Sequence, residues 1–167
     1  MESGIIFDVA TKPFPWQPIW AYGGAFFFGF LIIFLKKIKW RHAVSEKWGY
    51  FMILCAVVAA GYYTGHWYLS RQNHIKVLAN RRYEFVQGVV ENLHPMPDDG
   101  SSKESFTISG HIFLYSDYDE LGTTNCFDQT QPHGGPIHNG MLLRVKFIDD
   151  CILRLEVPSE NSVVNDK

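Results

Sequence analysis

The chain has 167 residues, of which 47% are hydrophobic, 16% aromatic and only 19% charged. This composition excludes disordered, collagen-like and coiled-coil proteins. The net charge of −2 hides an asymmetry, because residues 1–82 carry ten Lys/Arg and three Asp/Glu, whereas residues 83–167 carry five and fourteen. The acidic second half holds no basic cluster, which argues against nucleic acid as a partner.

Two uncharged stretches of 23 residues, 13–35 and 48–70, dominate the first half of the chain. A bilayer core about 30 Å thick needs about 20 apolar residues as a helix, and neither stretch alternates as a barrel strand would. The sequence therefore predicts an N-terminal segment (1–17) and a transmembrane helical hairpin (18–70) with spans at 18–36 and 48–70. The alternative is two buried helices of a soluble protein, which the little remaining sequence disfavours.

Small residues recur every four positions along both predicted spans. Such stripes let helix backbones approach closely in lipid, although small residues are also simply common in spans. The candidate helix-packing residues are Ala21, Ala25, Gly29, Ala56, Ala60, Gly61 and Gly65.

Positive charge between the spans indicates the orientation. Residues 36–47 hold five Lys/Arg, whereas the N-terminal flank holds only Lys12. Short loops rich in Lys/Arg stay in the cytoplasm and the first helix usually dominates, so we expect both termini outside. Segment 71–82 opposes this orientation, because its four Lys/Arg would then also lie outside. The pattern leaves open whether 71–82 is a basic linker or an extension of the second helix.

After residue 82 the hydrophobic period becomes that of strands, which predicts a β-domain over 83–158 and a flexible tail over 159–167. Residues 83–94 form one long predicted strand, with a bend or bulge at Gly88. A two-residue turn at 109–110 follows in the next hairpin. Under that pairing aromatic side chains share one face, because Phe106 lies opposite Phe113 and Ile108 opposite His111.

The last hairpin needs an irregularity. A plain two-residue turn at residues 149–150 would pair Val145 with Arg154 and put the two apolar sets on opposite faces. We therefore predict a three- or five-residue connection, or a bulge. The predicted core residues are Phe106, Phe113, Val145, Phe147 and Leu155.

About five short antiparallel strands tend to close, because closure removes exposed edges. The predicted fold class is an α+β membrane protein, in which a two-helix transmembrane hairpin precedes a small antiparallel β-barrel of OB-like or SH3-like type. No P-loop, GxGxxG or GxSxG motif occurs, and we expect no cofactor.

Four segments, GVVENLHPMP, ESFTISGHIFLYSDY, HGGPIHNGMLLRVKF and ILRLEV, resemble a family of small, uncharacterised bacterial membrane proteins. These proteins join transmembrane helices to a compact β-domain. The resemblance covers about residues 85–157 and not the helical hairpin. It implies a bacterial source and a folded domain, and it implies no reaction. Together with the two spans it predicts a multi-pass protein of the bacterial inner membrane, and the Lys/Arg distribution described above places the C-terminal domain outside the cytoplasm.

The loop over 117–140 holds the candidate site residues. Long loops in compact domains are often functional, and glycine permits unusual backbone angles there, although solvated loop carboxylates and plain structural shaping are the simpler alternatives. Zinc would need three or four converging ligands, and His133 and His138 are five apart, which fits no established ligand spacing. We therefore predict no metal site, with His111, His133 and His138 as the candidate ligands under the alternative. The candidate partner-binding residues are Asp117, Tyr118, Asp119, Glu120, His133, Gly134 and Gly135.

Two cysteines, Cys126 and Cys151, lie in the predicted β-domain. They would form a disulfide if the domain faces an oxidising compartment. Two unpaired thiols are the alternative, and the spacing does not decide between them.

These features predict a non-enzymatic, membrane-anchored interaction protein whose acidic β-domain binds a protein partner. One version is an immunity or inhibitor protein that neutralises a cationic toxin by charge complementarity, and another is an accessory subunit of a membrane complex. The alternative from a different class is an envelope enzyme, or a metal- or small-ligand-binding component, that uses the 117–140 loop.

Overall fold

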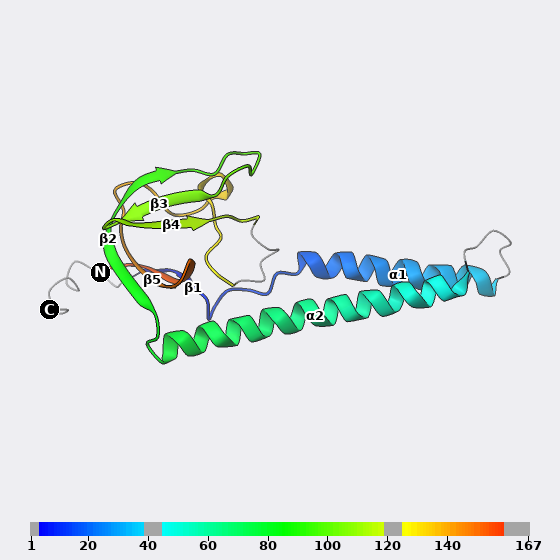
Figure 1. Cartoon of the computed structure of the whole chain (residues 1–167). Coiled ribbons are helices and arrows are strands. Elements are labelled where there is room, and N and C mark those ends of the chain that lie inside the picture. Colours follow the sequence, from blue (N-terminus) through cyan, green and yellow to red (C-terminus); the bar gives the residue numbers. More distant parts are fainter. Residues whose placement is uncertain (1–3, 39–44, 119–124, 159–167) are drawn as a thin grey trace. The chain divides into compact units, whose positions relative to one another are not determined.

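The computed structural model describes residues 4–38, 45–118 and 125–158. The chain divides into two units, a helical unit of residues 14–68 and a β-unit that contains residues up to 13 and from 69 onward. Figure 1 shows the elements in chain order. They are β1 (Gly4–Asp8), α1 (Gln17–Lys37), α2 (Glu46–Ala79), β2 (Glu84–His94), β3 (Glu104–Ile108), β4 (His111–Tyr115), the short 3-10 helix η2 (Gln131–His133), β5 (Leu142–Ile148) and β6 (Cys151–Val157).

Both helices are long and apolar enough to cross a membrane, by length and composition. Helix α1 has 21 residues and α2 has 34. At 1.5 Å per residue, α2 is about 51 Å long, well beyond a hydrocarbon core of about 30 Å. Of the two alternatives for residues 71–82, the structure has the helical one as far as Ala79, so that α2 contributes its last turns to the β-unit.

The two helices come into close backbone contact where two glycines face each other. A Cβ atom on Gly29 would lie 2.8 Å from the carbonyl oxygen of Gly49, and a Cβ on Gly49 would lie 2.7 Å from that of Gly29. Ala56 is also buried, whereas Gly61 and Gly65 are exposed and have nothing near them. Ala25 and Ala60 are partly buried, and Ala21 is exposed.

Six antiparallel strands form one sheet in the order β1-β6-β5-β2-β3-β4. Strand β2 joins its two halves, because residues 84–89 pair with β5 and the following residues pair with β3. The register shifts between Glu91 and His94, where Asn92 has a φ of 50°. The irregularity predicted at Gly88 therefore lies further along the strand. Gly88 has a different role, because a Cβ there would lie 2.5 Å from the hydroxyl oxygen of Ser109.

The sheet is open rather than closed into the predicted barrel. Strands β1 and β4 stand at the two ends of the strand order, and each has one strand neighbour among the described residues. Bending of β2 folds the two halves of the sheet over a common core, in which the ring of Phe113 on β4 lies 5.1 Å from that of Phe147 on β5. Apolar burial is thus achieved by bending, which does not require the two edges to join.

The predicted β3–β4 register is confirmed, with Phe106 opposite Phe113 and Ile108 opposite His111. The predicted bulge in the last hairpin is also present, because Lys146 pairs with Arg154 whereas Phe147 pairs with Ile152. The extra residue turns both apolar sets inward, as the prediction required. All five predicted core residues are buried in one cluster, together with Val90, Ile108, Tyr115, Phe127, Ile137, Leu143 and Ile152.

Strand β1 lies inside the N-terminal segment 1–17, for which the sequence predicts no strand or helix. It pairs with β6, with Ile5 opposite Glu156 and Asp8 opposite Arg154. The helical hairpin is therefore inserted into the chain of the β-unit, between β1 and β2.

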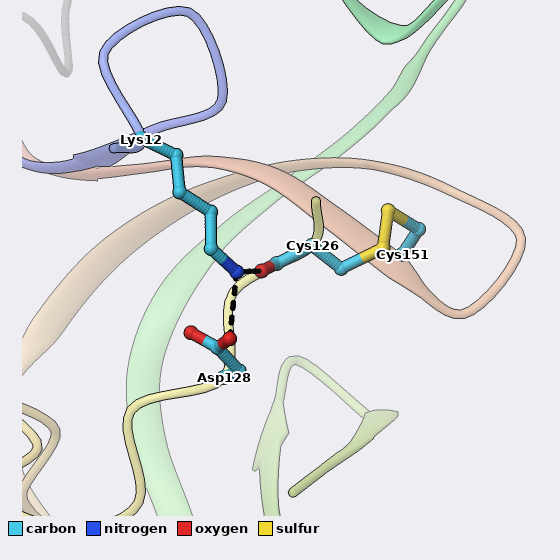
Figure 2. The surroundings of a disulfide bond; sticks show 4 residues. All are labelled: Lys12, Cys126, Asp128 and Cys151. Atoms are coloured by element: carbon cyan, nitrogen blue, oxygen red, sulfur yellow. Dashed lines mark hydrogen bonds and ion pairs between the residues drawn. A yellow bond between two sulfur atoms is a disulfide. The ribbon is translucent and has the colours of Figure 1, made fainter. Parts of the chain in front are cut away.

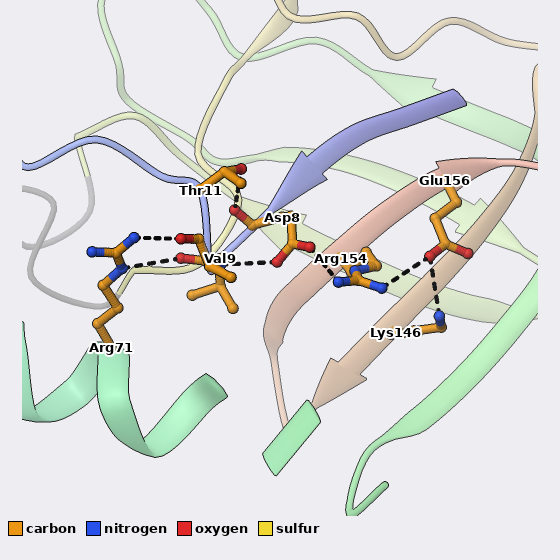
Figure 3. A network of polar contacts seen from close by, with 8 residues as sticks. Asp8, Val9, Thr11, Arg71, Lys146, Arg154 and Glu156 are labelled. Atoms are coloured by element: carbon orange, nitrogen blue, oxygen red, sulfur yellow. Dashed lines mark hydrogen bonds and ion pairs between the residues drawn. The ribbon is translucent and has the colours of Figure 1, made fainter. Parts of the chain in front are cut away.

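A polar network holds β1 in place (Figure 3). Arg154 on β6 forms ion pairs with Asp8 and with Glu156, which also accepts a hydrogen bond of 3.0 Å from Lys146. Arg71, on the last turns of α2, donates hydrogen bonds to the carbonyl oxygens that follow β1. The network ties the first residues of the β-unit to strands and a helix that come far later in the chain.

Candidate functional site

Part of the predicted loop site is assembled around Asp117. The hydroxyl of Thr130 donates a 3.0 Å hydrogen bond to Oδ2 of Asp117, and the same carboxylate oxygen contacts Nδ1 of His133. The ring of Tyr118 meets the ring of His133 edge-on, with their centroids 6.2 Å apart. The structure thus brings Asp117, Tyr118 and His133 together and adds Thr130. Asp119 and Glu120 lie outside the described residues.

The two candidate glycines shape this loop. Gly134 ends η2 in the left-handed conformation, with a φ of 85°. A Cβ on Gly135 would lie 2.3 Å from the carbonyl oxygen of Gln129 and 2.7 Å from the carbonyl carbon of Thr130, so a larger residue requires the backbone to move. Both positions therefore fix the path of the chain that carries His133.

The cluster differs from the arrangement of a hydrolytic triad. In such a triad the hydroxyl and the carboxylate occupy opposite nitrogens of the imidazole. Here the Thr130 hydroxyl, at 3.3 Å, and the Asp117 carboxylate both approach Nδ1 of His133. The His133 side chain is 50% exposed, and the cluster orders the loop surface.

Glu104 is a fully buried carboxylate that binds the backbone of this loop. It is not among the site residues predicted from the sequence. One oxygen of Glu104 accepts a hydrogen bond from the hydroxyl of Tyr115, and the other accepts 2.8 Å and 3.4 Å bonds from the amides of Gln131 and Met96. Burial, together with the hydrogen bond to Glu104, raises the pKa of Tyr115 above its ordinary value of 10.0. The contact between Glu104 and Tyr115 could have been predicted from the sequence. The predicted β3–β4 register places these two residues opposite each other, on the same face as the aromatic side chains.

The three candidate metal-binding histidines have separate surroundings. His111 packs against the rings of Phe113 and Phe147, each at 4.6 Å, and His138 lies 3.4 Å from the side-chain amide of Gln131. Within residues 4–38, 45–118 and 125–158, no group of three or more His, Cys, Asp or Glu side chains is placed to hold a metal ion.

Cys126 and Cys151 form a disulfide bond (Figure 2), which is one of the two arrangements that the sequence leaves open. Lys12 binds the segment that carries Cys126. Its ammonium group donates a 2.7 Å hydrogen bond to the carbonyl oxygen of Cys126 and forms an ion pair with Asp128 at 2.6 Å. The Lys12 side chain is only 11% exposed. Lys12, four residues after the end of β1, is thus largely buried beside the disulfide.

A cavity of about 370 Å³, which we call the acidic cavity, lies beside the disulfide. Its carboxylates come from two segments that the disulfide joins, since Asp128 follows Cys126 closely and Asp149 and Asp150 directly precede Cys151. Leu114 and Tyr115, at the end of β4, form an apolar wall, and Lys103 is a cation in the lining. Asp128 is paired with Lys12, so Asp149 and Asp150, against the single cation Lys103 of the lining, are the carboxylates that make the cavity suited to a cationic group.

His74 enters the acidic cavity from the last turns of α2. Its Nδ1 atom is buried and has no hydrogen-bond partner among the described residues. Burial lowers the pKa of His74 below its ordinary value of 6.5. A neutral imidazole therefore lines the acidic cavity together with the aspartates at neutral pH.

Comparison with models of protein families, with curated proteins and with solved structures finds no match to this chain.

Proposed function

We propose that the protein is anchored in the bacterial inner membrane by α1 and α2, and that its β-unit lies outside the cytoplasm and binds a cationic protein partner. The helices support the anchor, because only 11% of the apolar window of α1 and 17% of that of α2 is buried. Trp20 and Tyr62 are 78% and 75% exposed. Surfaces this apolar favour lipid, with aromatic rings at its borders.

The topology of the β-unit supports two crossings. Strand β1 precedes α1 and pairs with β6, which follows α2. The two strands can meet only on one side of a membrane, a condition that two spans satisfy and a single span would not. The β-unit with its inserted hairpin is therefore compatible with two crossings.

The disulfide supports the extracytoplasmic side. Disulfide bonds form and persist in oxidising compartments such as the bacterial periplasm and are rare in the cytosol. The bond between Cys126 and Cys151 thus agrees with the orientation expected from the Lys/Arg-rich connection between the spans.

The acidic cavity is the main observation in favour of a cationic partner. Residues 83–158 contain twelve Asp/Glu and four Lys/Arg, and the disulfide holds three of these carboxylates around one cavity. A field of this sign attracts a cationic protein and sets its orientation more than its raw affinity. An immunity or inhibitor protein directed at a cationic toxin would use it, and so would an accessory subunit with a basic neighbour.

Copurification from gently solubilised membranes tests this proposal. We expect a basic protein to be recovered with the full chain at low salt and to be released at high salt. The double variant Asp149→Asn/Asp150→Asn should recover less of it. The matched control Asp98→Asn/Asp99→Asn removes the same charge from residues outside the cavity lining and should behave as the wild type. Recovery of the wild-type chain alone, at stoichiometric purity, would contradict the proposal.

A further inference from the structure

The free edge of β4 is open to another strand. Ser109 and Gly110, with φ of 49° and 82°, form the two-residue turn between β3 and β4. In such a hairpin the residues that flank the turn exchange both backbone hydrogen bonds, and the next pair exchanges none. The N–H and C=O groups of Ile112 and Leu114 therefore point away from β3, towards the free edge.

Nothing in the described part of the chain occupies this edge. No backbone hydrogen bond to Ile112 or Leu114 is found there beyond the β3–β4 pairing. Their side chains are 63% and 52% exposed. We call residues 111–115 with these outward groups the β4 edge.

The β4 edge also lacks the features that protect natural sheet edges. Edge strands are usually shielded by lysines, prolines, inward charges or bulges. Strand β4 has the sequence HIFLY, with no Lys, Arg, Asp, Glu or Pro, and it pairs with β3 without a register shift. An edge of this kind accepts an extended peptide through main-chain hydrogen bonds.

The acidic cavity lies at one end of the β4 edge. Leu114 belongs to both the edge and the cavity. Its backbone N–H and C=O groups point towards the free edge, and Leu114 also lines the cavity, together with Asp128, Asp149 and Asp150. A strand laid along β4 would therefore carry its side chains past these carboxylates. Successive side chains of a strand alternate in direction, so one of them can point into the cavity while its neighbours stay outside.

We propose that the β4 edge binds an extended segment of a protein partner by strand addition, and that the acidic cavity receives a Lys or Arg side chain of that segment. This inference rests on the proposed function and names the part of the partner that is recognised. A second copy of this chain is a poorer occupant, because it would bring its own acidic domain against the first.

Binding of a defined peptide to the full chain in detergent micelles tests this inference. The probe is a peptide of about seven residues, the length of an ordinary strand, that alternates valine with threonine and ends in two lysines. We expect binding that is lost when the amides facing β4 are N-methylated, because N-methylation removes main-chain donors and leaves the charge unchanged. A probe with glutamates in place of the lysines should not bind.

Protein variants separate the two parts of the site. Ile112→Pro removes an outward N–H of an edge strand, where proline is tolerated, and should weaken probe binding about tenfold or more. Asp149→Asn/Asp150→Asn should weaken it to a similar extent, whereas Asp98→Asn/Asp99→Asn should not. Circular dichroism confirms that each variant remains folded.

Equal binding of the N-methylated probe, no effect of the cavity variant, or no binding of any probe would overturn the inference. A wild-type chain that sediments as a dimer and is made monomeric by Ile112→Pro would also overturn it, because the occupant would then be a second copy. If the probe fails but the basic partner still copurifies, the inference falls and the proposed function stands.

Discussion

Glu104 joins the core of the β-unit to the loop that carries Asp117 and His133. Its carboxylate is fully buried, and its hydrogen-bond partners within the described residues are all donors, namely the Tyr115 hydroxyl and two backbone amides. A buried carboxylate is tolerated only while such donors are in place. The loop surface therefore depends on a residue that never reaches solvent.

Tyr115→Phe tests this dependence. The substitution leaves one oxygen of Glu104 without its hydroxyl donor, so we expect a loss of about 1–3 kcal/mol in the free energy of unfolding of the β-unit. The double variant Tyr115→Phe/Glu104→Gln should recover part of this loss, because it also removes the buried charge. Thermal unfolding of the full chain in detergent measures both. Equal stability of Tyr115→Phe and wild type would contradict the role given to Glu104.

We expect His74 to make the stability of the β-unit sensitive to acid. Because burial lowers the pKa of His74 in the folded state, the unfolded chain takes up the proton first as the pH falls below the ordinary value of 6.5. The contribution of the neutral imidazole to stability is present above that pH and is lost below it. We expect the melting temperature to fall between pH 7.5 and pH 5.5, and to fall less in His74→Gln. An identical fall in the melting temperature of both proteins would show that protonation of His74 does not affect the stability of the β-unit.

At the scale of elements, two glycines determine how the helical hairpin packs. A Cβ at Gly49 would meet the Gly29 carbonyl at 2.7 Å, whereas a Cβ at Gly61 would meet nothing within 4 Å. Gly49→Ala should therefore lower the melting temperature of the full chain in detergent, and the matched control Gly61→Ala should leave it unchanged or raise it. A lower melting temperature for Gly61→Ala alone would place the packing face on the other side of α2.

Strand β1 should be essential to the stability of the β-unit although it lies before both helices. The ring of Phe7 on β1 meets that of Phe127 at 5.4 Å, beside the disulfide. Phe7→Ala should cost about 2–3 kcal/mol, less than for a fully buried ring, because Phe7 is only partly buried. The exposed neighbour Ile5, replaced by Ala, provides a control with a small effect. Amide hydrogen exchange of the strands, followed as denaturant is added, compares the two, because all five tryptophans lie within residues 14–68 and do not report on the β-unit.

The sequence predicts the elements whose signals are local. Alternation and the Ser109-Gly110 turn predict the β3–β4 register, and the requirement for a shared core predicts the bulge in the last hairpin. Strand β1 escapes prediction because five residues near a terminus form a strand only by pairing with a partner about 150 positions away. The acidic cavity escapes for the same reason, since its walls come from segments joined by a disulfide whose formation depends on the compartment.

Barrel closure is the prediction that the fold does not meet. The argument from strand number assumes that all free edges are removed by joining them. Here the bend of β2 buries the core while β1 and β4 remain at opposite ends of the strand order. The sequence indicates which side chains are buried. Whether the sheet keeps free edges depends on how far β2 bends, and no local sequence pattern predicts that bend.

At the scale of the whole molecule, the account depends on an inserted hairpin. A β-unit whose first strand precedes two long apolar helices and whose remaining strands follow them is compatible with a membrane only if the helices cross it twice. In the proposed orientation the disulfide lies on the oxidising side of the membrane. The proposed anchor and orientation rest on the inserted hairpin and the disulfide, and the proposed partner surface rests on the acidic cavity.

Cysteine accessibility in spheroplasts tests that arrangement most directly. In a Cys55→Ala background, we expect a membrane-impermeant maleimide to label Cys126 and Cys151 only after treatment with an impermeant reductant, without opening the membrane. A single cysteine at Lys47→Cys, in a chain whose native cysteines are replaced, should be labelled only after the membrane is opened. Labelling of Cys126 and Cys151 that requires an opened membrane and no reductant would contradict the account.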